Sequence, residues 1–141
     1  MAVNPTVRLI ATLSNLIRRK IHSLDRIPGL TPVQDAVLHF ILGRCREQDL
    51  FQKHVEEEFN LRRSTATELL KLMEKKGLIY REGVSYDARL KKVMPTEKGI
   101  MLEGQVLKDI LEMERLVTKG IPKEELEAFL ATGTKMMNNL K

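Results

Sequence analysis

Short hydroxyl-bearing and long basic side chains alternate with apolar ones over residues 62–76. An α-helix turns by about 100° per residue, so a helix here would place Ala66 and Met73 at the centre of one apolar face. The opposite side and its flanks would carry a polar set, namely Arg63, Ser64, Thr65, Thr67, Glu68, Lys71 and Lys75. Hydroxyls and a carboxylate at the front of a helix can hydrogen-bond to base edges in the DNA major groove, and lysines can neutralise phosphates.

Two of these residues allow a second interpretation. The segment Thr65-Ala66-Thr67-Glu68 has the sequence of a capping box, in which Thr65 and Glu68 would only complete the hydrogen bonds of a first helical turn. The segment by itself therefore leaves two alternatives open, a helix that reads DNA and a plain surface helix.

A second cationic group follows in a polar loop over residues 83–89, between short strands predicted at 78–82 and 90–94. The loop is too long for a two-residue hairpin turn, so we expect it to project. Arg89, followed by Lys91 and Lys92, could enter a minor groove, and Asp87 could hold its guanidinium in place. Taken alone, Asp87 and Arg89 are more simply a surface ion pair, but beside a DNA-reading helix we favour the DNA contact.

The distribution of charge points to an anionic partner. The chain has 24 Lys and Arg against 19 Asp and Glu, a net charge of +5. Residues 61–98 hold ten basic and five acidic side chains, whereas the segments before and after are close to neutral. Positive charge gathered in one segment favours double-stranded DNA as the partner, with a merely well-solvated surface as the alternative.

Composition limits the class of protein. With 141 residues, 43% of them apolar and 30% charged, the chain fits one globular domain. Cys45 is its single cysteine and cannot form a disulfide within the chain. No charged-then-apolar leader opens the sequence, and no apolar run approaches the roughly 20 residues of a membrane span. We therefore expect a soluble, cytoplasmic protein that does not enter a membrane.

The elements that position these groups can be read from apolar spacing and cap residues. The pattern predicts helices over residues 5–27, 32–43, 50–59, 62–76, 96–119 and 122–140. Thr31 and Gln34 fit a capping box, and Asp49 and Thr96 can cap later helices. The third and fourth helices, joined at Asn60, have the helix-turn-helix layout. The terminal helices have long apolar stripes and little sheet to cover, which favours burial against a second copy.

Three strings occur in this order: Leu30-Thr31-Pro32-Val33-Gln34, then Leu61-Arg62-Arg63-Ser64-Thr65-Ala66-Thr67 running into Leu72-Met73-Glu74-Lys75-Lys76-Gly77-Leu78-Ile79, then Asp87-Ala88-Arg89 through Pro95-Thr96-Glu97-Lys98-Gly99. Together they resemble the MarR (multiple antibiotic resistance regulator) family of winged helix-turn-helix transcription factors. The resemblance implies a mainly α fold with a small antiparallel β wing (α+β). It implies one MarR-like domain over residues 1–141, with a winged helix-turn-helix DNA-binding lobe at 30–99 and dimerisation helices at 1–29 and 100–141.

The resemblance also implies partners and a site. It implies a homodimer on a pseudo-palindromic operator, with a recognition helix over residues 63–76 and a wing tip at Asp87 and Arg89. It implies control by a small aromatic or amphipathic effector held between the dimerisation helices and the winged lobe, where we expect His22, Arg26 and His39. Glu68 departs from the family pattern, which often has a basic residue there, and Pro95 replaces the usual leucine.

Catalytic and metal chemistry is not predicted. The histidines lie on different predicted helices without the spacing of metal ligands, and the sequence has no phosphate-binding glycine loop, nucleophile elbow or paired catalytic carboxylates. We therefore expect no enzyme, no cofactor and no metal. The arginines on either side of Cys45 could lower the pKa of its thiol, but a passive thiol is the better interpretation.

The sequence thus predicts a DNA-binding transcriptional regulator that acts as a ligand-responsive homodimeric repressor. The main alternative is a winged-helix protein-interaction module without DNA binding. A small hydrolase or transferase would need a His or Cys beside an acid in one pocket, and the sequence supplies no such pair.

Overall fold

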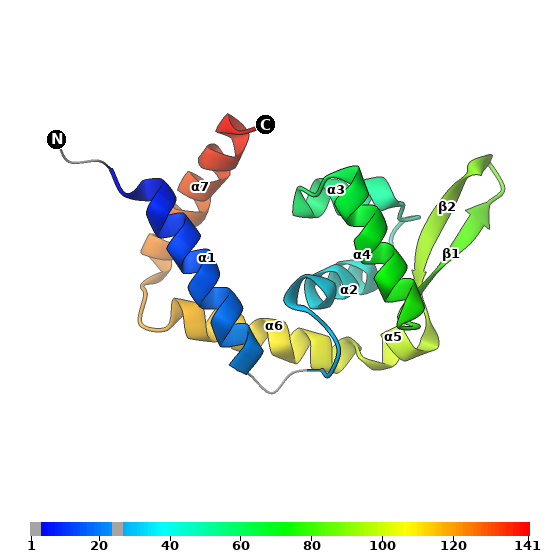
Figure 1. The fold of residues 1–141 in the computed structure, drawn as a ribbon, viewed down its shortest axis with the longest axis horizontal. Helices are drawn as coiled ribbons and strands as arrows, with labels where there is room; N and C mark the ends of the chain where they lie inside the picture. The colour runs from blue at the N-terminus through cyan, green and yellow to red at the C-terminus, as the bar shows by residue number, and fades with distance from the viewer. Residues whose placement is uncertain (1–3, 24–26) are drawn as a thin grey trace. The chain divides into compact units, whose positions relative to one another are not determined.

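The computed structural model describes residues 4–23 and 27–141, with only the backbone of residues 22 and 23 (Figure 1). The described chain is mainly helical with one two-stranded antiparallel sheet, which confirms the predicted α+β winged fold. The chain forms two compact units, Met1–Ile110 and Leu111–Lys141.

Helix α1 covers Thr6–Ser23. The predicted continuation over residues 24–26 lies outside the described residues, and Ile27 itself is not helical, so the predicted end at residue 27 is wrong. Ile27 precedes a turn in which Gly29 has a φ of +82°, a backbone conformation that favours glycine. Several apolar side chains of α1 stay exposed, with Val7 at 80% of its full accessible surface.

Helix α2 covers Pro32–Arg44, and α3 (Gln52–Phe59) and α4 (Arg63–Lys75) form the predicted helix-turn-helix. The capping box of α2 is confirmed, because Thr31 Oγ1 accepts from Gln34 N and Gln34 Oε1 accepts from Thr31 N. The predicted cap by Asp49 is wrong. Helix α3 starts at Gln52, two residues later than this cap requires, and the Phe51 amide donates to His54 Nδ1 instead.

The core of the first unit lies between these helices, the sheet and α6 (Glu103–Thr118). Its fully buried apolar side chains include Val37, Leu38, Ile41, Leu42, Val55, Leu70, Met73, Leu78, Val93 and Val106. Three of the four inward positions predicted for α4, at Ala66, Leu70 and Met73, are completely buried, and Leu69 is nearly so. This packing fixes which side of α4 faces outward.

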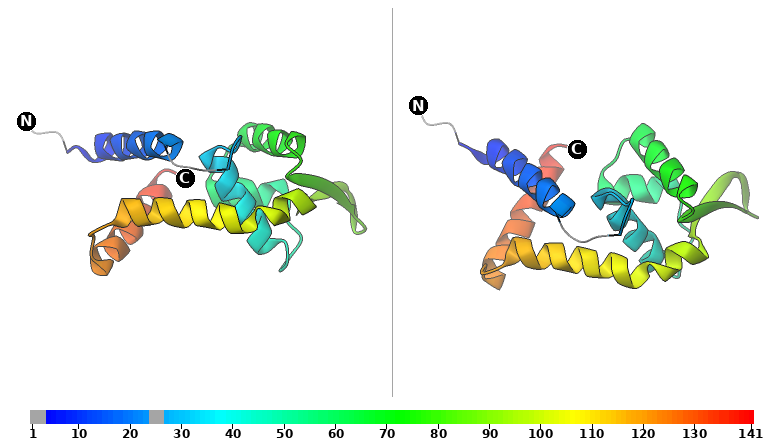
Figure 2. Two further views of the ribbon diagram at one scale, coloured as in Figure 1. Left: turned by 90° about the horizontal axis from the view of Figure 1, so that it is seen from below. Right: turned by 60° about the horizontal axis from the view of Figure 1, so that its bottom comes forward.

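The wing consists of β1 (Ile79–Val84) and β2 (Asp87–Pro95), which extend as a two-stranded arm in two further views (Figure 2). The predicted seven-residue loop is wrong, because Val84 pairs with Asp87 and leaves only Ser85 and Tyr86 between the strands. The register shifts between Gly83 and Val84, so that residues 88–90 of β2 form a bulge. A bulge inserts extra residues into one strand, which is why pairing can continue to the tip.

The predicted long helix over residues 96–119 is two helices. Helix α5 covers Glu97–Met101, and α6 starts at Glu103. The break falls at Leu102, whose amide bonds to the Gly99 carbonyl in a tighter turn and whose side chain packs against the core. The Thr96 cap is confirmed, because its hydroxyl accepts from Gly99 N at 3.1 Å.

The second unit contains the end of α6 and helix α7 (Lys123–Asn139), which begins after Pro122 as predicted. Glu124 and Glu125 lie in its first turn, where the helix dipole favours negative charge. Its apolar side chains are exposed in the single chain, with Phe129 at 60% and Leu130 at 65%.

Candidate nucleic-acid interface

Helix α4 presents the predicted polar face. Six of the seven polar residues predicted on it are exposed, namely Arg63, Ser64, Thr65, Glu68, Lys71 and Lys75. The capping-box alternative for Thr65 and Glu68 is wrong, because α4 begins at Arg63 after an N-cap at Arg62, and both residues lie inside the helix. Their side chains are therefore available on the surface of the helix.

Thr67 is the exception on this face. Its side chain is half-buried, and its hydroxyl donates to the Arg63 carbonyl at 2.9 Å and accepts from Gln52 Nε2, also at 2.9 Å. The structure thus joins Thr67 to α3.

The wing holds one arginine outward. Asp87 Oδ1 accepts from the backbone amide of Arg89 at 2.9 Å and from its Nε at 3.4 Å, as predicted for this pair. The Arg89 side chain is 90% exposed. An exposed ion pair of this kind contributes little to stability, so its main physical effect is to restrain the direction of the guanidinium.

Lys91 and Lys92 lie on opposite faces of β2, because side chains alternate along a strand. Lys91 is exposed and lines the cavity described below. The Lys92 ammonium lies 3.8 Å from Asp49 and 3.7 Å from Glu82, so its charge is balanced by acids. Strand alternation therefore removes Lys92 from the positive surface that the sequence predicted.

Tyr86, at the tip of the wing, is tied to the segment before α3. Its hydroxyl donates to Asp49 Oδ2 at 3.0 Å. Partial desolvation, this hydrogen bond and the negative charge of Asp49 raise the pKa of Tyr86 above its ordinary value. The wing thus has a polar contact with the segment before α3, which the sequence did not predict.

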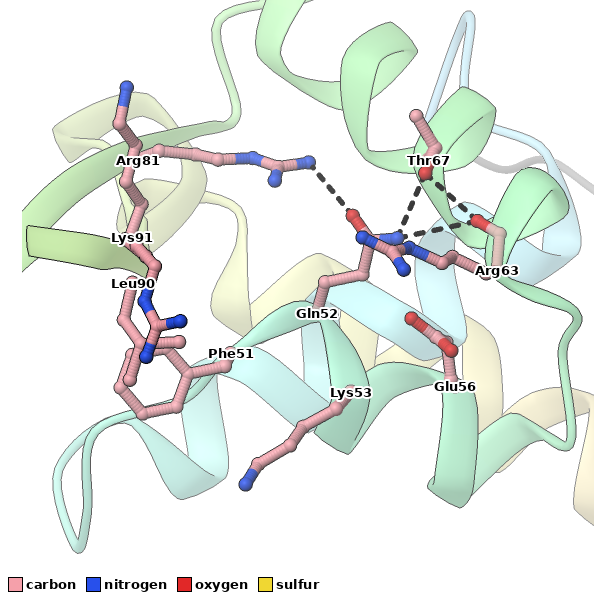
Figure 3. A pocket seen from close by; sticks show the side chains of 10 residues that line it. Phe51, Gln52, Lys53, Glu56, Arg63, Thr67, Arg81, Leu90 and Lys91 are labelled. Atoms are coloured by element: carbon pink, nitrogen blue, oxygen red, sulfur yellow. Dashed lines mark hydrogen bonds between the residues drawn. The ribbon is translucent and has the colours of Figure 1, made fainter. Parts of the chain in front are cut away.

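A cavity of about 520 Å³ lies between α3, α4 and the wing. It is lined by Phe51, Gln52, Lys53, Glu56, Arg63, Thr67, Arg81, Arg89, Leu90 and Lys91 (Figure 3). Five cationic side chains and one carboxylate line it. Arg81 and Arg89 are also paired with Glu74 and Asp87, and the remaining excess of positive charge is suited to an anionic backbone. Gln52, Lys53 and Arg81 were not predicted as site residues, since they come from two elements whose approach the sequence pattern does not show.

The fold that positions these groups is shared with known proteins. The sequence profile of the MarR family matches residues 29–90. The crystal structure of the transcription regulator MarR from Oenococcus oeni PSU-1 is 30% identical, covers 95% of this chain and 98% of its own, and has a TM-score of 0.71. This chain belongs to the MarR family.

Two other proteins of similar fold were solved with bound molecules. The S. aureus MepR–DNA complex is 26% identical, covers 94% of this chain and 96% of its own, and has a TM-score of 0.79. PcaV from Streptomyces coelicolor, in complex with its natural ligand, is 20% identical, covers 100% of this chain and 99% of its own, and also has a TM-score of 0.79. The matched proteins are transcription regulators, which confirms the prediction that this MarR-family chain is not an enzyme.

Of the three residues expected to line an effector cleft in this MarR-family chain, only His39 can be placed. The side chain of His22, and Arg26 altogether, lie outside the described residues. His39 lines an apolar cavity of about 390 Å³ with Ala36, Phe40, Gly43, Arg44, Glu58, Phe59 and Ile110. The rings of Phe40 and Phe59 meet edge to face with centroids 5.7 Å apart. This volume falls in the range of small-molecule sites.

Cys45 lies at the C-terminal cap of α2, and its thiol donates to the Leu42 carbonyl at 3.7 Å. Burial raises the pKa of the Cys45 thiol, against the lowering effect of Arg46. Within residues 4–21 and 27–141, whose side chains are described, no three His, Cys, Asp or Glu side chains are placed to hold a metal ion. Among the helices described, none is long and apolar enough to cross a membrane.

Proposed function

We propose that this MarR-family chain is a ligand-responsive transcriptional repressor that binds a pseudo-palindromic operator as a homodimer. The observation that carries the proposal is the Arg89 side chain, 90% exposed and restrained by Asp87 beside a helix with an exposed polar face. MepR, a relative of the same fold, was solved in complex with DNA.

The proposal gives each group a contact. Ser64, Thr65 and Glu68 face base edges in the major groove, and Lys71 and Lys75 face phosphates. Arg89 enters the minor groove, where its long planar cation follows the negative potential. The cationic cavity beside α4, with Arg63 and Lys91 at its edge, neutralises the intervening phosphates. Such a protein acts where operator DNA lies, so the proposal includes a cytoplasmic location.

The homodimer is supported by the exposed apolar side chains of the helices at the two ends of the chain. Those exposed by 50% or more are Val7, Leu9 and Leu16 in α1, Leu111 in α6, and Phe129, Leu130 and Met137 in α7. Apolar surface of this extent on a single subunit favours burial against a partner, and a twofold axis would place two α4 helices about 34 Å apart, one turn of DNA.

The ligand response is supported by the cavity of His39, which combines aromatic rings with the Arg44 guanidinium, 5.7 Å from the centroid of Phe40. A small aromatic or amphipathic molecule fits such a lining. PcaV, of the same fold, was solved with its natural ligand.

The test compares Arg89→Ala with Arg115→Ala on a duplex that the wild-type protein selects from genomic fragments. Both variants remove one exposed arginine paired with a carboxylate, Arg89 with Asp87 and Arg115 with Glu112. Arg89→Ala should weaken operator binding by about 1–3 kcal/mol, or about 5- to 150-fold, at fixed salt. Arg115→Ala should change it by less than about twofold.

Equal affinities for wild type and Arg89→Ala would refute the wing contact. Failure of the wild type to retain any duplex would refute DNA binding and favour a protein-interaction module. Repeating the wild-type measurement with benzoate and other small aromatic acids tests the ligand response, which predicts release of the duplex by at least one of them.

A further inference from the structure

Gln52, the first residue of α3, has its side chain at the meeting point of three elements (Figure 3). Its Nε2 donates to Thr67 Oγ1 at 2.9 Å and to the Arg63 carbonyl at 3.3 Å, both on the first turns of α4. Its Oε1 accepts from Arg81 Nη2 on β1 at 3.4 Å. We infer that Gln52 is a positioning residue that fixes the start of α4 against α3 and the wing, and thereby helps the protein discriminate between DNA sequences.

The direction of these hydrogen bonds is fixed by the partners. A carbonyl oxygen can only accept and a guanidinium can only donate. The amide nitrogen of Gln52 must therefore face Arg63, and its oxygen must face Arg81. Both hydrogens of the amide are used within the protein, so Gln52 has none left for a DNA phosphate.

The hydroxyl of Thr67 is also engaged within the protein. Its hydroxyl hydrogen goes to the Arg63 carbonyl, and the hydroxyl oxygen receives the Gln52 amide. Thr67 thus has no hydrogen to donate to a base. It joins Gln52 in holding the first turn of α4, and Ser64 and Glu68, exposed on the same turns, remain to contact DNA.

Arg81 extends this network along α4. Its Nη2 reaches Gln52, and its Nε donates to Glu74 Oε1 at 3.0 Å, more than one helical turn beyond Thr67. The Arg81 side chain is only 25% exposed, so water screens these bonds less than it screens the pair at the wing tip. The two ends of α4 are therefore linked to one strand of the wing.

Discrimination between DNA sequences depends on how firmly these hydrogen bonds hold α4. A recognition side chain must lie within about 0.5 Å of its productive position, and hydrogen bonds behind it provide that restraint. Contacts to phosphates tolerate more movement and do not depend on sequence. Loss of the Gln52 bonds should therefore weaken binding to the correct sequence more than binding to a random one.

The experiment rests on the proposed function and measures the ratio of two affinities. Gln52→Met keeps the length of the side chain and removes the amide. The control, Gln105→Met, removes another half-buried glutamine amide, which bonds to Asp109 at 2.8 Å on α6. Each variant is titrated at fixed salt with the selected duplex and with a random-sequence duplex of equal length.

We expect Gln52→Met to lower the ratio of specific to random affinity about tenfold, with random-sequence binding unchanged. Gln105→Met should leave the ratio unchanged even if it lowers the melting temperature. Thr67→Val keeps the shape and removes the hydroxyl. Because Gln52 acts partly through Thr67, the double variant should lose less discrimination than the two single losses combined.

If the ratio of specific to random affinity is unchanged in Gln52→Met, the inference is overturned. This includes equal losses of affinity for both duplexes, which would indicate general unfolding or a contact to the DNA backbone. If the wild type selects no duplex, the proposed function fails separately. Amide hydrogen exchange on the free protein then decides the positioning role, which predicts exchange about tenfold faster at the start of α4 in Gln52→Met than in wild type. Equal exchange rates would overturn it.

Discussion

Gly99 occupies the tightest position at the junction between the wing and the helices. It is the third residue of α5, it is buried, and its amide bonds to Thr96 Oγ1. A Cβ added at Gly99 would overlap the carbonyl oxygen of Leu78 and would also lie 3.4 Å from the Leu78 carbonyl carbon. Because both atoms belong to the backbone, no side-chain rotation can relieve the overlap.

The cost of Gly99→Ala follows from two opposing effects. Overpacking a well-ordered site costs about 1–3 kcal/mol, and a backbone overlap belongs at the upper end. Replacing glycine by alanine in a helix stabilises the helix by up to about 1 kcal/mol. The net loss in the free energy of unfolding should be about 2 kcal/mol, or roughly 4–8 °C in melting temperature for a chain of this size. The displaced Leu78 carbonyl also accepts from Thr96 N at 3.0 Å, so the start of α5 should loosen as well.

Thermal and urea unfolding followed by circular dichroism test this expectation, with Gly104→Ala as the matched control. An added Cβ at Gly104, in the first turn of α6, would meet no heavy atom within 4 Å. Gly104→Ala should therefore raise stability by about 0.5 kcal/mol. If Gly99→Ala proved as stable as wild type, the close approach of α5 to Leu78 would not be a rigid feature of the fold.

Three further predictions concern the wing, the thiol and the assembly. In a Tyr80→Phe background Tyr86 is the only tyrosine, and its tyrosinate absorbance should titrate above the ordinary tyrosine pKa. Adding Asp49→Asn should lower the pKa of Tyr86. If the titration of Tyr86 does not change in Asp49→Asn, the contact with Asp49 is contradicted. Because the pKa of Tyr86 is raised in the fold, the contact should stabilise the wing below the ordinary tyrosine pKa and lose that effect as pH rises through the raised one. The raised pKa of Cys45 keeps its thiol protonated near pH 7, so a thiol reagent should modify the native protein more slowly than the urea-unfolded chain. A faster reaction of the native protein would indicate an activated thiol and contradict this expectation. Sedimentation should give twice the 16.2 kDa of one chain, and Phe129→Glu should shift it toward monomer, whereas a monomeric wild type would refute the dimer.

The sequence predicted the elements whose stabilising interactions lie close along the chain. Thr31 and Gln34 are three residues apart, and Thr96 and Gly99 likewise, so both caps could be foreseen and both form. The apolar face of α4 followed from a period that only a helix satisfies. The predicted Asp49 cap failed because His54, with its own Nδ1 acceptor, took the Phe51 amide.

The remaining differences arise where distant segments meet. The wing was expected to have a long loop because glycine and polar residues near 83–89 are typical of turns, but the bulge at 88–90 lets the strands pair almost to the tip. The long helix was expected to be continuous because its apolar spacing hardly changes at Leu102. What breaks it is packing of that side chain against a core formed by other elements.

The network of Gln52 shows the same limit at the candidate site. Its three partners come from α4 and β1, between 11 and 29 positions further along the chain. No local spacing relates a glutamine at the start of one helix to an arginine on a later strand, so its type alone suggests only a solvated surface. Thr67 was predicted as a DNA contact because it lies on the side of the predicted helix opposite the apolar face. Helix periodicity does not show that a neighbouring helix contacts that side, as Gln52 of α3 does. Helix periodicity therefore shows which residues lie opposite the apolar face of a helix. The hydrogen bonds of the folded chain show which of those residues still have a donor that is not engaged within the protein.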